Sequence, residues 1–145
     1  MLSKPSLTLK RRLKAPPAQV YSAWTDPKKI ARWFGPREAD QASVTAEIDL
    51  RVGGRYRINF TGEGGEQHQV GGVYRELVPG RRLVFSWAWH STPERTSLVS
   101  ITLDPDGSEG TLLTLQHEQF FDEKARDGHE RGWTGTLEKL EQYLA

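Results

Sequence analysis

The sequence contains no cysteine among its 145 residues, which excludes disulfide bonds, thiolate metal sites and a cysteine nucleophile. This absence suits the reducing cytosol, so we expect a cytoplasmic protein. The N-terminal segment MLSKPSLTLKRRLKAPP lacks the apolar stretch of a secretion signal. No run approaches the ~20 apolar residues that a membrane span needs. We therefore expect neither a signal peptide nor a membrane span.

An excess of charge of one sign is also missing, because 20 lysines and arginines stand against 19 aspartates and glutamates. This balance gives no reason to expect nucleic acid or an anionic membrane as a partner. The four histidines do not have the spacing of a metal site. The glycine-rich stretches lack the lysine and helix of a phosphate loop, and no serine occupies a Gly-x-Ser-x-Gly elbow. We expect no metal and no cofactor.

Aromatic residues, in contrast, make up 10% of the chain, with five tryptophans. The stretch LVFSWAWH, residues 83–90, places Phe85, Trp87 and Trp89 on alternate positions. In a β-strand these three large side chains would share one face. We predict that this face is concave and that Trp87 or Trp89 borders an internal cavity.

The N-terminal third is predicted to form one strand and two short helices. Alternating leucines over residues 7–13 indicate the strand. Pro16 and Pro17 can then open a helix, since proline is tolerated in the first turn. Asp26 is placed to cap a second helix that ends at Gly35-Pro36. This order predicts a strand followed by two helices.

From Ser43 to His117 the apolar period is two, and turn signals at regular spacing predict an antiparallel meander of about six strands. The period returns to 3.6 in a predicted helix over residues 122–144, whose apolar stripe includes Trp133 and Leu137. Three glycines form a second stripe on this helix: Gly128, Gly132 and Gly135. They indicate either close backbone packing or a loose first half, and the sequence leaves both possibilities open.

The predicted architecture leaves concave space to fill. One helix about 10 Å wide cannot cover a twisted sheet of six or seven strands. Large side chains must fill the rest, or a cavity remains. Buried indole N–H groups need partners, and several of them could fix the polar edge of a planar or partly aromatic ligand.

Several stretches carry a family resemblance over essentially the whole chain: APPAQVYSAWTDPKKIARWFGP, DLRVGGRYRINF, GGVYRELVPGRRLVFSWAWH, GTLLTLQHEQF and HERGWTGTLEKLEQYL. They resemble bacterial START-like (SRPBCC) proteins that share a domain with the activator of the ninety-kilodalton heat-shock protein ATPase. The resemblance implies an α+β helix-grip fold in one domain over residues 1–145. A curved antiparallel sheet of six to seven strands would wrap around the long C-terminal helix, with two short helices after strand one and a hydrophobic cavity between sheet and helix.

Three functions stay open at this point. The first is binding of a small hydrophobic or aromatic molecule, and the family name adds a link to the stress response. The second is a polyketide cyclase- or hydrolase-like enzyme that uses the same pocket. The third is a chaperone-interacting module. The eukaryotic co-chaperone, however, has a separate N-terminal domain for much of its chaperone contact, and this chain has no room for it.

The expected ligand-binding residues are mainly aromatic and could equally form the core: Trp33, Phe34, Tyr56, Phe60, Tyr74, Phe85, Trp87, Trp89, His117, Trp133 and Leu137. For the enzyme, His117 is the candidate acid or base, because it alternates with Leu113 and Leu115 and points inward. Tyr74 and Glu76 are candidate assistants, since Glu76 shares the alternation of Tyr74. A lone inward histidine is more often structural than catalytic. The sequence identifies neither the ligand nor the oligomeric state.

Overall fold

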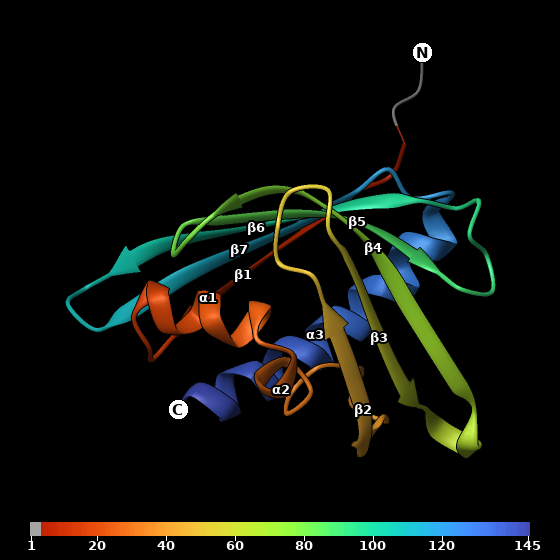
Figure 1. The fold of residues 1–145 in the computed structure, drawn as a ribbon, viewed down its shortest axis with the longest axis horizontal. Helices are drawn as coiled ribbons and strands as arrows, with labels where there is room; N and C mark the ends of the chain where they lie inside the picture. The colour runs from red at the N-terminus through yellow and green to blue at the C-terminus, as the bar shows by residue number, and fades with distance from the viewer. Residues whose placement is uncertain (1–3) are drawn as a thin grey trace.

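The computed structural model describes residues 4–145 (Figure 1). Residues 1–3 begin the N-terminal segment assessed for a signal peptide, and they lie outside the described part. Its elements follow the predicted order: β1 (Leu7–Leu13), α1 (Pro17–Thr25), α2 (Pro27–Ile30), β2 (Asp40–Ile48), β3 (Arg55–Thr61), a 3-10 turn (Glu63–Gly65), β4 (Gln67–Val78), β5 (Arg82–Trp89), β6 (Ser97–Asp106), β7 (Gly110–Glu118) and α3 (Glu123–Leu144). Over this part of the chain, no helix has the length and apolar character needed to cross a bilayer.

Local chemistry fixes where the helices begin. The Asp26 carboxylate accepts a hydrogen bond from the Lys28 amide at 2.9 Å, and Pro27 occupies the first position of α2. Asp122 caps α3 in the same way, since it accepts from the Ala125 amide at 2.8 Å. Caps of this kind stabilise a helix by about 1 kcal/mol each. The predicted helix over residues 122–144 is confirmed, since α3 spans Glu123–Leu144.

The seven strands form one antiparallel sheet in the order β1-β7-β6-β5-β4-β3-β2. Strands β2 to β7 form a meander, whereas β1 lies at the far edge from β2 because α1 and α2 separate them. Figure 1 shows that the sheet curls into a half-barrel, with α3 running along its concave side and α1 and α2 beside it. The predicted α+β helix-grip fold is confirmed.

The core lies between the concave face of the sheet and the helices. Leu137 and Leu140 of α3 are wholly buried there, and Trp133 is 3% exposed. Trp24 of α1 packs edge-on against Trp33, with ring centroids 4.7 Å apart. Trp133 and Leu137 thus face the sheet, as the helical stripe predicted.

The placement predicted for Glu76 is wrong. A register shift between Tyr74 and Glu76 interrupts the pairing of β4 with β5, so the strict alternation beyond Tyr74 is lost. Tyr74 is buried, whereas Glu76 is exposed and its carboxylate lies 3.2 Å from the Arg82 guanidinium. Glu76 therefore cannot contribute a carboxylate to the interior.

Candidate functional site

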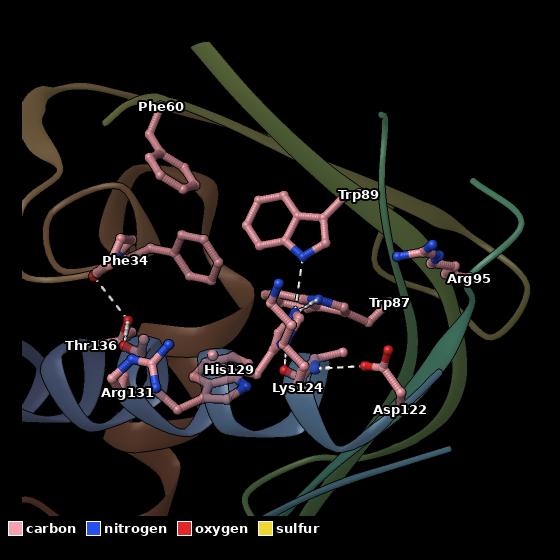
Figure 2. Close-up of a pocket in the computed structure, with 16 residues that line it drawn as sticks. Phe34, Phe60, Trp87, Trp89, Arg95, Asp122, Lys124, His129, Arg131 and Thr136 are labelled. Atoms are coloured by element: carbon pink, nitrogen blue, oxygen red, sulfur yellow. Dashed lines mark hydrogen bonds between the residues drawn. The ribbon is translucent and has the colours of Figure 1, made fainter. Parts of the chain in front are cut away.

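A pocket of about 710 Å³ lies between the first half of α3 and the end of β5 (Figure 2). Its apolar wall is formed by five aromatic side chains: Phe34, Phe60, Trp87, Trp89 and Trp133. Four exposed charged residues line its rim, so the pocket opens to solvent: Arg95, Asp122, Lys124 and Arg131. The volume falls within the range of about 300–1,000 Å³ typical of small-molecule sites.

The glycines of α3 give the pocket one of its sides. Gly128 and Gly132 line it, and a Cβ atom added to Gly132 would meet nothing within 4 Å. Gly135 lies one turn further along, where a Cβ atom would come within 3.0 Å of the Arg37 backbone nitrogen. Close backbone packing, one of the two explanations for the glycine stripe, therefore holds at Gly135. The first two glycines leave space, and the third allows close packing.

The opposite side of the pocket is held in place by hydrogen bonds from α3. The Thr136 hydroxyl donates to the Gly35 carbonyl at 2.8 Å. The Lys139 ammonium donates to the Gln41 side-chain carbonyl at 2.6 Å and to the Pro36 carbonyl at 3.2 Å. Burial lowers the pKa of Lys139. These contacts fix the segment that carries Phe34 against the helix.

His129 joins the two tryptophans of β5 to α3 (Figure 2). The indole N–H groups of Trp87 and Trp89 both donate to His129 Nε2, at 3.2 and 2.9 Å. Because an indole can only donate, Nε2 carries no proton, and the ring proton on Nδ1 is donated to the Ala125 carbonyl at 2.7 Å. Burial lowers the pKa of His129, although the bond to Ala125 opposes that shift. The neutral ring is therefore the form that fits this site.

His117 makes a second contact of this kind deeper in the protein. Its Nδ1 accepts from the Trp133 indole at 3.0 Å, so its proton lies on Nε2 and is donated to the Ser97 hydroxyl at 2.7 Å. The side chain is wholly buried. Burial, followed by the nearby His129, lowers the pKa of His117 to about 2. Both ring nitrogens bind protein groups, and the pocket wall does not include this residue.

The expectation that indole N–H groups would fix the polar edge of a ligand is wrong for four of the five tryptophans. Trp87, Trp89 and Trp133 donate to histidines, and Trp33 donates to the Ala23 carbonyl at 3.2 Å. The fifth, Trp24, has a buried N–H without a protein partner among residues 4–145, but it does not line the large pocket. The wall consequently presents aromatic rings whose polar atoms are already occupied.

Five of the eleven expected ligand-binding residues line this pocket, and six lie elsewhere: Trp33, Tyr56, Tyr74, Phe85, His117 and Leu137. Tyr56, Tyr74 and Phe85 pack on one another, with ring centroids 5.2–6.2 Å apart. The Tyr56 hydroxyl also donates to the Ser86 carbonyl at 2.7 Å. This cluster borders a cavity of only about 20 Å³, because its rings fill the space.

The three candidate catalytic residues do not form a common site. Tyr74 packs against Tyr56 and Phe85, and burial, followed by the nearby Tyr21, raises the pKa of Tyr74. Glu76 lies on the surface, and His117 is enclosed near Trp133. Among residues 4–145, no three His, Cys, Asp or Glu side chains gather in a way that could hold a metal ion.

Sequence reasoning missed the role of His129 and the charged rim. His129 lies one helical turn before Trp133, at the edge of the apolar stripe, and that position was the only available signal. The rim cations Arg95, Lys124 and Arg131 carried no signal, because exposed charges usually form a solvated face.

Comparisons with known proteins agree on the family. The sequence matches the family model of activator of Hsp90 ATPase homolog 1-like proteins over residues 14–145. A structure from Chromobacterium violaceum is 30% identical, with a TM-score of 0.82 and 96% of each chain covered. CalU16 from Micromonospora echinospora is 31% identical, with a TM-score of 0.72, over 97% of this chain and 76% of that one. The AHSA1 protein from Silicibacter pomeroyi is 26% identical, with a TM-score of 0.79 and 97% of each chain covered. No curated protein matches the sequence.

Proposed function

Since the chain belongs to the family of activator of Hsp90 ATPase homolog 1-like proteins, we propose that it binds a small hydrophobic or aromatic molecule in the pocket between β5 and α3. The family match is consistent with a ligand-binding helix-grip domain. The observation that carries the proposal is the pocket of about 710 Å³ with its wall of five aromatic side chains. Pockets for small molecules are lined mainly by such groups.

The aromatic wall favours a ligand with a flat ring. Trp87 and Trp89 meet edge to face, with ring centroids 5.6 Å apart and an angle of 88° between the planes. Both rings are held by His129, so their orientation does not depend on a ligand. Aromatic pairs in offset or edge-to-face contact gain about 0.5–1.5 kcal/mol beyond the area that they bury. A rigid wall also reduces the entropy lost when a ligand binds.

A neutral fluorescent dye tests this proposal. N-phenyl-1-naphthylamine brightens in apolar surroundings, and we expect its fluorescence to saturate at one dye per chain. Gly132→Phe should weaken binding at least about tenfold, because the new ring would occupy the open space beside Gly132. Gln142→Phe is the matched control, since residue 142 is exposed on the same helix and lies outside the pocket.

Thermal unfolding of both variants confirms that the fold is kept. The proposal is wrong if the dye does not bind the wild-type protein. It is also wrong if a folded Gly132→Phe variant binds the dye as tightly as Gln142→Phe does. If the dye binds as expected, native mass spectrometry of freshly purified protein can identify a co-purified ligand by the mass that it adds.

A further inference from the structure

The charges around the pocket are distributed unevenly. Three cations line the pocket, Arg95, Lys124 and Arg131, and among residues 4–145 Asp122 is the one carboxylate that does so. Asp122 is already engaged as the cap of α3, where it accepts from the Ala125 amide. In the part of the chain that the structure describes, none of the three cations forms an ion pair. The mouth of the pocket therefore has an excess of positive charge.

The first half of α3 shows that this excess is a property of the pocket and not of the helix. Its acids Glu123, Asp127 and Glu130 do not line the pocket, whereas Lys124 and Arg131 do. Asp127 instead lies 3.1 Å from the guanidinium of the neighbouring Arg126. Glu130 lines an adjacent hollow, and Arg131 lies at the border of the two. Two of the three cations in this half of the helix therefore line the pocket, whereas its acids do not.

Arg95 adds positive charge from a different element. It belongs to the loop between β5 and β6, and its guanidinium lies 4.0 Å above the ring of Phe121. Figure 2 shows Arg95 and Arg131 on opposite sides of the pocket, with the Trp89 ring between them. An acidic group at the mouth would therefore be flanked by cations from both the loop and the helix.

The interior of the pocket offers a ligand little polar contact. Trp87 and Trp89 donate to His129, Trp133 donates to His117, and Thr136 donates to the Gly35 carbonyl. A polar group placed among these rings would lose its hydration and gain no partner, which is unfavourable. Recognition of a polar group must therefore take place at the charged mouth.

From these observations we propose that the pocket is selective for an anionic aromatic molecule, such as an aromatic carboxylic acid. Its ring would lie against the aromatic wall, and its acidic group would lie at the mouth, where Arg95, Lys124 and Arg131 supply positive charge. This inference rests on the proposed ligand-binding function, and it adds the charge of the ligand and the residues that select it. Guanidinium groups suit a carboxylate because their geometry allows two parallel hydrogen bonds.

Three probes that share one ring system but differ in charge test the inference. They are 2-naphthoate, 2-naphthalenemethanol and 2-naphthylmethylammonium, and their affinities are measured by isothermal titration calorimetry at low salt. We expect naphthoate to bind about tenfold more tightly than the alcohol, because several exposed cations each contribute a modest attraction. The ammonium should bind most weakly. Raising the ionic strength should reduce the affinity for naphthoate and leave that for the alcohol unchanged.

A triple variant locates the effect at the mouth. Replacing Arg95, Lys124 and Arg131 by glutamine should remove the preference for naphthoate while the alcohol still binds. The matched control replaces three exposed cations outside the pocket by glutamine and changes the net charge equally: Lys10, Lys28 and Arg75. The control should keep most of the preference.

The outcomes separate this inference from the proposed function. The anion selectivity is overturned if naphthoate binds no more tightly than the alcohol. It is also overturned if neither probe binds detectably. A triple variant that keeps the preference overturns it as well. The proposed function stands in these cases if the neutral dye N-phenyl-1-naphthylamine still binds, and it fails with the inference if the dye does not.

Discussion

Strand β5 carries three aromatic side chains in a row on its concave face, yet the first and the last of them meet very different surroundings. At Phe85 the rings of Tyr56 and Tyr74 close around a cavity of about 20 Å³, which Trp24 and Ile30 of the short helices also border. At Trp89 the covering element is the glycine-containing half of α3, and the space is about 710 Å³. We name these regions the filled end and the open end.

The comparison shows that an aromatic side chain does not by itself make a pocket or a core. The same alternation places Phe85, Trp87 and Trp89 on one face. What differs is the covering element, which presents large side chains at the filled end and the bare backbone of Gly128 and Gly132 at the open end. The absence of two side chains on the helix creates the space that the strand then lines.

The largest expected effect is on stability at the filled end. Phe85→Ala should lower the free energy of unfolding by about 3–5 kcal/mol, because it leaves a void among packed rings. Trp89→Ala should cost less, roughly 2 kcal/mol, since Trp89 already borders open space and its loss enlarges an existing pocket. Urea unfolding of the two variants measures both values. Equal losses would remove the distinction between the two ends.

Acidification tests the buried histidine behind the wall. The folded protein keeps His117 neutral down to about pH 2, whereas the unfolded chain takes up a proton near the ordinary pKa of 6.5. At any pH between about 2 and 6.5, the chain therefore takes up a proton at His117 when it unfolds. Stability should be greatest above about pH 6.5, and His117 alone should lower it by about 1.4 kcal/mol per pH unit below that value. His129 should add to this slope, because burial lowers its pKa as well. Urea unfolding between pH 7 and pH 5 measures this slope.

A variant assigns the slope to this residue. His117→Asn should reduce the pH dependence, although it will also be less stable at every pH because Trp133 and Ser97 lose their partner. His90→Gln is the control, since His90 is exposed. If His117→Asn kept the full slope, the acid sensitivity would have to come from another group.

The smallest expected effect distinguishes two glycines on one helix. Gly132→Ala should stabilise the protein by up to about 1 kcal/mol, because alanine is the better helix former and its methyl group meets no atom. Gly135→Ala should destabilise it, since the methyl group would lie 3.0 Å from the Arg37 backbone, which the bond from Thr136 to Gly35 holds close by. Melting temperatures report both signs. Equal shifts would mean that the helix packs loosely along its whole length.

Features determined by nearby residues were predictable from the sequence. Asp26 marks the start of α2 because a cap depends on the next three residues. The strands and the ends of α3 followed from apolar periods in the same way. Trp87 and Trp89 could also be placed on one face with Phe85, since alternation determines which residues share a face where no bulge interrupts the strand.

Features determined by partners distant in the sequence were not predictable. Glu76 was misplaced because a bulge depends on how β4 pairs with β5, and alternation alone does not reveal it. The importance of His129 depends on two indoles about 40 residues away. The charged mouth likewise joins Arg95 of a loop to Lys124 and Arg131 of the helix. Each of these features arises only when separate elements meet.

The position of β1 in the sheet also determines the order in which the chain can fold. Leu7 pairs with His117 and Leu13 with Thr111, so the first strand finds its partner only when nearly the whole sheet exists. During synthesis the N-terminal part emerges first, and contacts between distant residues form slowly because a long loop must close. The meander from β2 to β6 can pair strand by strand as it emerges. The strand that is made first is therefore the last to join the sheet.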